Sequence, residues 1–121
     1  MGLLDLSSMV ELNRLPELFC GIDRRPGEGP TLYPVACSPQ AWAAAAPFLI
    51  LQSCLGISID AERKRILFDD PYLPDGIPTL AIKNLRCGDI GVDLMLERRN
   101  DSVLVHKAGS PSAIEIVTIV S

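Results

Sequence analysis

The 121-residue sequence has few aromatic residues, a single histidine and no concentration of positive charge. Aromatic residues make up 5% of it while hydrophobic residues make up 48%, so we expect a core of aliphatic side chains. The net charge is −4, and basic residues occur as pairs such as Arg24-Arg25 and not as a stripe. Because binding to phosphates requires a concentrated basic surface, we expect no nucleic-acid partner.

Patterns for metal binding, export and membrane insertion are also missing. The four cysteines form no CxxC pair and the lone histidine has no clustered companion, so we expect no metal and no cofactor. The longest apolar run, residues 41–51, has 11 residues, about half of the roughly 20 that span a bilayer. Without a cationic region and long apolar run at the N-terminus, these features predict a cytoplasmic protein with no membrane contact and reduced, mostly buried thiols.

Two helices are predicted in the first half of the chain. Residues 3–13 carry apolar side chains at helical spacing. The second helix is better signalled: Ser38 is a suitable N-cap, Pro39 suits the first helical position, and Gly56 supplies the stop. This second helix is apolar on almost every side, so it requires neighbours on every side. The predicted sheet can cover one side but nothing in this chain meets the other, which implies that the chain forms a homo-oligomer through that surface or is part of something larger. Pro47 should kink the helix or remove one hydrogen bond.

Between these helices, residues 15–34 form a long irregular loop. Four prolines and three glycines within this range exclude a regular element. The loop nevertheless contains large apolar side chains, which make it too apolar for a disordered segment. Long ordered loops of this kind are uncommon in compact domains and often carry function.

After Gly56 the pattern changes to short β-strands. Apolar and polar side chains alternate with period two, and turn-forming residues separate the segments. The predicted strands are "ISID", "RILFDD", "TLAIKNLRC", "IGVDLMLER", "SVLVHKA" and "AIEIVTIV". We therefore predict an α+β fold, with one or two helices and the loop in residues 1–56, and a small antiparallel sheet or sandwich in residues 57–121.

Polar residues in and after the loop are the candidates for a functional site. Glu17 lies in the apolar context "RLPELFCG", where a desolvated carboxylate can act as a general acid or base; it can equally be a solvated side chain or cap a backbone amide. Arg24 could hold a carboxylate or a sugar hydroxyl, or simply be solvated. Tyr33, Gln40 and Trp42 surround the start of the second helix, where a polar ligand could bind, although Gln40 also suits a capping role and Trp42 the core.

Residues 14–57 carry a distinctive resemblance. The motif "LPELFCG" is followed by "YPVACSPQAWAA" and a leucine-rich helix, an order that closely resembles the end of the catalytic domain in bacterial amylo-alpha-1,6-glucosidase (glycogen-debranching-like) proteins. The sequence departs from the motif at Ala45, where glycine is common in the family. Residues after Gly56 look like the small C-terminal β-domain that follows the helical barrel in such proteins.

The resemblance implies a fold, a reaction and a role for Glu17. The family is similar to the glucoamylase-like group, in which an (α/α)6 barrel hydrolyses α-glucosidic bonds with inversion, using one carboxylic acid and one carboxylate base. The base lies in an "E-x-F" context on a loop leading into the last barrel helix, and Glu17 in "PELF" matches it. No segment here matches the general acid, which implies a C-terminal fragment that is inactive alone, with an α-glucan or oligosaccharide as the substrate of the full-length enzyme.

Two further interpretations remain open at this level. A related inverting disaccharide phosphorylase shares the barrel and the β-domain, but phosphate replaces water there and no carboxylate base is needed. The other interpretation is a stand-alone β-rich interaction module whose apolar helix docks onto a partner.

Overall fold

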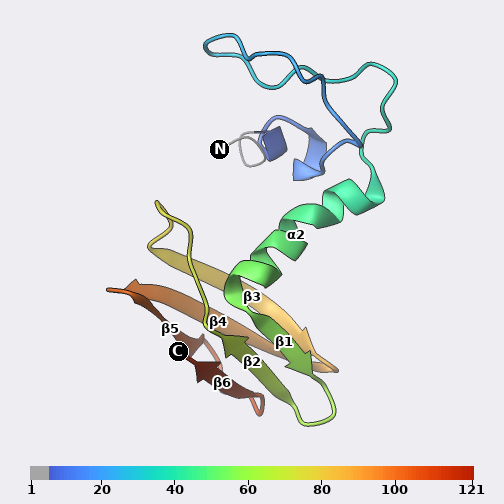
Figure 1. Ribbon diagram of the computed structural model, residues 1–121. Coiled ribbons are helices and arrows are strands. Elements are labelled where there is room, and N and C mark those ends of the chain that lie inside the picture. Colours follow the sequence, from blue (N-terminus) through green and yellow to red (C-terminus); the bar gives the residue numbers. More distant parts are fainter. Residues whose placement is uncertain (1–5) are drawn as a thin grey trace. The chain divides into compact units, whose positions relative to one another are not determined.

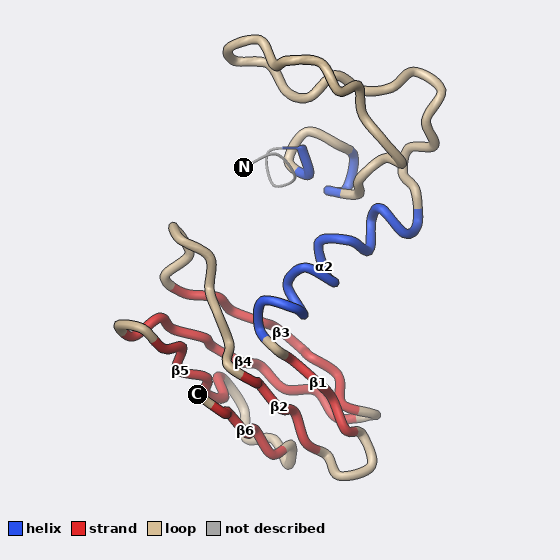
Figure 2. The backbone as a smooth tube through the Cα atoms, in the orientation of Figure 1, coloured by secondary structure: helices blue, strands red, loops and turns tan. Residues whose placement is uncertain are grey.

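The computed structural model describes residues 6–121, which form one α-helix and two sheets of three strands each (Figures 1 and 2). This mixed composition confirms the α+β class, and the described residues form no helical barrel. The chain separates into two compact units, residues 1–50 and residues 51–121. No helix within residues 6–121 is long and apolar enough to cross a membrane.

The helix predicted for residues 3–13 is not continuous. Residues 3–5 lie outside the described part of the chain, and helical geometry ends after Ser7. A 3₁₀ turn, η1, follows at Glu11–Asn13, with Leu12 at φ 54° and Asn13 at φ 56°. Both residues lie in the left-handed region, which an α-helix does not tolerate, so the apolar spacing of this segment does not produce a regular helix.

Helix α2 spans Ala41–Leu55 and begins later than predicted. The Gln40 carbonyl accepts the first helical hydrogen bond, from the Ala44 amide at 2.8 Å, so Gln40 and not Ser38 occupies the N-cap position. The Ser38–Pro39 peptide bond is cis and precedes the helix. The predicted stop is confirmed: Gly56 has φ +55°, and a Cβ atom there would lie 1.9 Å from the Asp69 carbonyl oxygen.

Helix α2 has an uncovered apolar surface, as expected for one of its sides, but the exposed part is larger than one side. Leu55 is its buried residue, whereas Trp42 is 69% exposed and Phe48 is 74% exposed. Leu49 and Ile50 are exposed as well. A helix with apolar side chains on all faces therefore presents most of its large ones to solvent in this chain.

Six strands, all predicted from the sequence pattern, make up the two sheets. The first sheet has the order β1-β2-β6 and the second has the order β3-β4-β5. Their bounds are β1 Ile57–Asp60, β2 Arg65–Asp69, β3 Thr79–Cys87, β4 Ile90–Arg99, β5 Ser102–Ala108 and β6 Glu115–Ile119. Three of the strand pairs are antiparallel, but β2 and β6 are parallel, which corrects the prediction of a wholly antiparallel sheet. The reason is the long connection through the second sheet, which returns the chain to β2 in the same direction.

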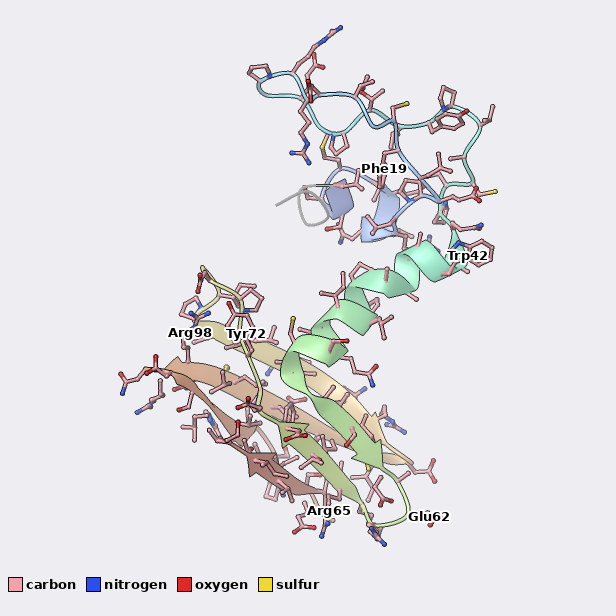
Figure 3. All side chains as sticks on the ribbon, in the orientation of Figure 1. Phe19, Trp42, Glu62, Arg65, Tyr72 and Arg98 are labelled. Carbon is pink, nitrogen blue, oxygen red and sulfur yellow. The ribbon has the colours of Figure 1, made fainter. Side chains whose placement is uncertain are left out.

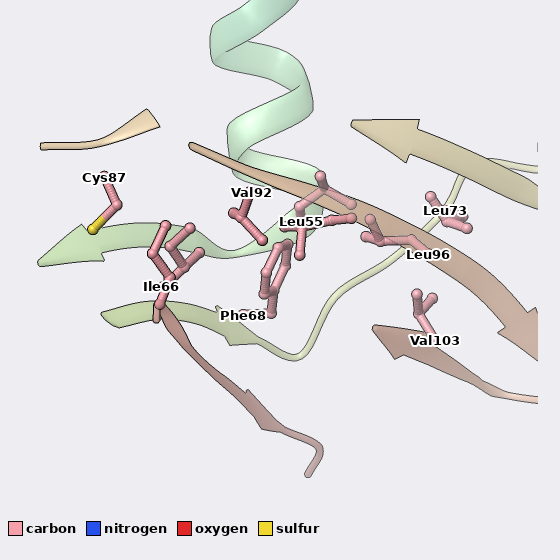
Figure 4. Packing of buried hydrophobic residues seen from close by; sticks show 10 residues of the cluster. Leu55, Ile66, Phe68, Leu73, Cys87, Val92, Leu96 and Val103 are labelled. Carbon is pink, nitrogen blue, oxygen red and sulfur yellow. The ribbon is translucent and has the colours of Figure 1, made fainter. Parts of the chain in front are cut away.

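One hydrophobic cluster joins the two sheets. Ile66 and Phe68 of β2 and Leu94 and Leu96 of β4 have no exposed surface, and Figure 4 shows side chains from both sheets meeting around Phe68. The cluster is aliphatic apart from Phe68 and Cys87, as the scarcity of aromatic residues predicted. Its other members are Leu55, Leu73, Val92, Val103 and Ile114. Residues 51–121 therefore contain a two-layer β-core of their own.

The cysteines are free, but most of them are not buried. Cys87 is buried in the β-core, Cys20 and Cys54 are half-buried, and Cys37 is exposed. The expectation of mostly buried thiols is therefore wrong. The cause is the loop that carries Cys20 and Cys37, which lies on the surface of its own unit.

Candidate functional site

Residues 15–40 form a loop whose two arms are held together by backbone hydrogen bonds. At its base the Gln40 amide donates to the Leu15 carbonyl at 3.1 Å. Farther along, Phe19 and Leu32 form an isolated antiparallel bridge, and the Cys20 amide donates to the Thr31 carbonyl at 2.9 Å. Figure 3 labels Phe19 on one arm and Trp42 just beyond the base of the loop. Paired backbone groups explain how so proline-rich a segment keeps a defined course.

Glu17 lies on the first arm, between the base of the loop and the Phe19–Leu32 bridge. Its backbone amide donates to the Cys37 carbonyl at 2.9 Å, and its Oε2 accepts the Cys37 amide at 3.3 Å. The residue is exposed, while Leu15 and Pro16 before it are buried. The carboxylate is thus fixed to the opposite arm and open to solvent, which combines the solvated and the amide-capping arrangements.

The remaining sequence-predicted residues are distributed along the loop and the start of α2. Gln40 is half-buried and lies at the base of the loop. Its hydrogen bond to Leu15 is next to the one that joins Glu17 and Cys37. Arg24 is exposed in the distal part of the loop, beyond the Cys20–Thr31 hydrogen bond. Tyr33 is exposed on the returning arm, and Trp42 is exposed in the first turn of α2. The structure thus brings Glu17 and Gln40 to the same end of the loop and places Arg24 at the other.

A second polar site, which the sequence analysis missed, lies in the β-rich unit. A hollow of about 190 Å³ opens between the segment after β2 and the β4–β5 hairpin. It is lined by Pro71, Tyr72, Leu73, Arg98, Asn100, Asp101, Ser102 and Val103. We call it the Tyr72–Arg98 groove. The sequence feature that could have indicated this site is Tyr72, an aromatic residue inside the proline-rich connection "DPYLPDGIP".

Arg98 organises this groove. Its Nη1 lies 3.0 Å from Asp75 Oδ1, and its Nη2 donates to the Pro74 carbonyl at 2.7 Å and also to the Leu73 carbonyl. The guanidinium carbon lies 5.9 Å from the centre of the Tyr72 ring, an arrangement that Figure 3 shows at the end of the sheet. The positive charge of Arg98 is therefore paired with acceptors of the protein itself. The Tyr72 ring is held beside it, and 53% of Tyr72 is exposed.

Another hollow, of about 450 Å³, lies along β5 and the end of the chain. Apart from Arg99, Ser102 and Thr118, its lining is aliphatic, with Val103, Leu104, Val105 and Val120. It offers few polar groups to orient a ligand. Within residues 6–121, no group of histidine, cysteine, aspartate and glutamate side chains is arranged to hold a metal ion.

Comparisons of the chain with protein-family models, with curated proteins and with solved structures find no significant match.

Proposed function

We propose that this chain is the C-terminal part of an inverting glycoside hydrolase that acts on α-glucosidic bonds, of the amylo-alpha-1,6-glucosidase (glycogen-debranching) type. The observation that carries the proposal is the setting of Glu17, an exposed carboxylate fixed on an ordered loop that leads directly into α2. The resemblance of residues 14–57 to the end of such catalytic domains supports it. In this assignment Glu17 is the general base.

The arrangement around Glu17 suits a base. Oε2 accepts the Cys37 amide, so the carboxylate is oriented while Oε1 is left to accept a hydrogen bond from water. An inverting hydrolase needs its base roughly 6.5–9.5 Å from the acid, with the attacking water between them. The acid belongs to an earlier part of the longer enzyme, and Arg24, Tyr33, Gln40 and Trp42 are proposed to contact the substrate there.

The exposed apolar surface of α2 fits the same proposal. Trp42, Phe48, Leu49 and Ile50 are exposed, and the other helices of an α/α barrel would cover such a helix. The same surface supports one alternative, an interaction module that binds a partner or a second copy through α2. Sedimentation of the purified chain separates them in part: a discrete, stable homodimer favours the module, because an incomplete barrel helix defines no single partner surface.

The decisive experiment replaces Glu17 in a longer protein that ends in this chain. Glu17→Gln is expected to lower kcat for α-glucan hydrolysis by about 10²–10⁴-fold, the usual contribution of general acid–base catalysis. Glu28→Gln is the matched control, because it removes an exposed glutamate from the same loop and should leave kcat unchanged. The 121-residue chain by itself is expected to release no glucose.

Each part of the proposal can be contradicted by a separate experimental result. Glucose release by the isolated chain contradicts the missing general acid. Full activity of Glu17→Gln removes Glu17 as the base. Activity of the longer protein that requires phosphate, with a sugar phosphate as product, assigns it to the inverting disaccharide phosphorylases instead.

A further inference from the structure

We propose that the Tyr72–Arg98 groove is a saccharide-binding site, separate from Glu17, that takes one glucose unit of an α-glucan. The chemistry of the groove supplies the saccharide class, and the choice of an α-linked glucose polymer rests on the proposed function. The groove belongs entirely to residues 51–121, whereas Glu17 belongs to the other unit. Binding in the groove therefore needs no catalytic residue.

The side chains that line the groove are those that a sugar ring requires. A pyranose has a face of C–H groups and an edge of hydroxyls, so it binds where an exposed aromatic ring lies beside fixed hydrogen-bonding groups. Tyr72 supplies the ring, and Arg98 packed against it limits its motion. From the two-residue β4–β5 turn, Asn100 supplies donors and an acceptor and Asp101 supplies acceptors. The Ser102 hydroxyl at the start of β5 donates to the Arg99 carbonyl at 3.2 Å and can accept a hydrogen bond from a ligand.

The charges in the groove favour a neutral ligand over an anion. Arg98 is paired with Asp75 and with two backbone carbonyls, so its donors are directed within the protein. Asp101, the other charged residue of the lining, is acidic and would repel an anion. A neutral ligand rich in hydroxyls meets neither obstacle, because Asp101 and Asn100 can accept hydrogen bonds from it.

The size of the groove limits the ligand to about one ring. Its volume of about 190 Å³ is smaller than the roughly 300–1,000 Å³ of pockets that enclose drug-sized ligands. One hexose ring fits this space, and the rest of an oligosaccharide extends into solvent. With so few contacts we expect a dissociation constant on the order of 1 mM, which suits a site that holds a long polymer near the enzyme by repeated weak contacts.

The test is a titration of the intact 121-residue chain with maltotriose, followed by the backbone amide signals in ¹H–¹⁵N NMR spectra. Saturable shifts are expected for Asn100, Asp101, Ser102 and Val103. Tyr72→Ala should weaken binding at least about tenfold, because it removes the stacking surface. Phe48→Ala is the matched control: it removes another exposed aromatic side chain, which lies in α2 and is neither part of the groove nor a proposed substrate contact, and it should leave the affinity unchanged.

The spectrum of unliganded Tyr72→Ala reports whether the variant folds. Should it not, Asp101→Ala, a change in an exposed turn, takes its place, with a loss of at least about threefold expected for one hydrogen-bonding group. Sulfate is titrated in parallel. No saturable shift with maltotriose, tighter binding of sulfate, or unchanged affinity in the variants overturns the proposal.

These results are independent of the catalytic proposal. Maltotriose binding that depends on Tyr72 can coexist with full activity of Glu17→Gln, and then only the assigned reaction fails. If Glu17→Gln loses activity but maltotriose causes no saturable shifts in the groove, only the saccharide-binding proposal fails.

Discussion

The side chain of Asp93 binds the backbone at a β-bulge in strand β3 of the second sheet. The register of β3 and β4 shifts between Ile82 and Leu85, and Asn84 within this bulge has φ +50°. The Asn84 amide donates to Asp93 Oδ1 at 2.8 Å, and Lys83 Nζ lies 3.5 Å from Asp93 Oδ2. This backbone hydrogen bond, and then the charge of Lys83, hold the pKa of the Asp93 carboxyl below its usual value despite partial desolvation.

Asp93→Asn is expected to lower the Tm of the chain at pH 7, with an effect that disappears in acid. A carboxyl with a lowered folded-state pKa stabilises the fold above its unfolded pKa of about 3.9, and this stabilisation is lost as pH falls through the folded-state value. Thermal unfolding of wild type and variant from pH 7 to pH 2 measures the difference. Asp89→Asn, which removes a charge from the β3–β4 turn, is the control and should show a smaller change. A Tm difference that is equal at pH 7 and pH 2 would contradict the assignment.

Single residues show how far sequence reasoning reaches. Gly56 was predicted as a helix stop, and its positive φ with the Asp69 carbonyl close by gives the physical reason. Ser38 was predicted as an N-cap because its type and the following proline fit a local rule, yet the helix begins after Gln40. The partner of Glu17 is the Cys37 amide, 20 residues away, and no local pattern could have named it.

At the scale of elements, strands were predictable and their partners were not. Period-two alternation depends on which face of a strand is buried, and it located all six strands to within two residues. The pairing of β2 with β6 joins segments about 50 positions apart, as the Arg65–Glu115 register and the 2.8 Å ion pair between these two residues show. The groove depends on the same kind of long-range contact, because Arg98 and Tyr72 come from different segments.

Arg98 fastens the segment between β2 and β3 to the second sheet. Its guanidinium binds the Leu73 and Pro74 carbonyls, and its amide donates to the Pro78 carbonyl at 2.9 Å. Leu73 is 1% exposed and belongs to the core cluster, so this segment covers part of the β-core.

Arg98→Ala is expected to lower the free energy of unfolding by about 1–3 kcal/mol, because it leaves backbone carbonyls beside the core without their charged donor. Urea denaturation measures the change. Arg99→Ala is the matched control: Arg99 is the next residue, its side chain is 67% exposed, and it pairs with Glu97 at 3.3 Å on the surface. Such a surface pair contributes at most about 1 kcal/mol. Equal losses for the two variants would show that Arg98 does not fasten the segment.

At the scale of the whole molecule, the chain combines two units that are stabilised by different interactions. Residues 6–50 rely on hydrogen bonds between the loop arms and on the burial of a few side chains such as Leu6 and Leu15, each at most 3% exposed. Residues 51–121 contain the entire core cluster, from Leu55 to Ile114. The sequence predicted the loop, the second helix and the strands that follow it, but not the loss of the first helix. The apolar pattern of α2 also indicated that this chain would leave one side of the helix uncovered, but a helical pattern alone does not determine what covers it.

Because its core is complete, the fragment of residues 51–121 is expected to fold without the rest of the chain. It retains both sheets, the covering segment around Leu73 and the last turn of α2 with Leu55. Urea unfolding of the fragment, followed by the amide signals of β2 and β4, should be cooperative and have the same midpoint as these signals show in the 121-residue chain. Phe68→Ala in the fragment should cost about 3–5 kcal/mol, since it empties the centre of the cluster, and should leave little folded population. A fragment without dispersed amide signals, or with a midpoint far below that of the intact chain, would mean that residues up to 50 contribute to the stability of the β-core.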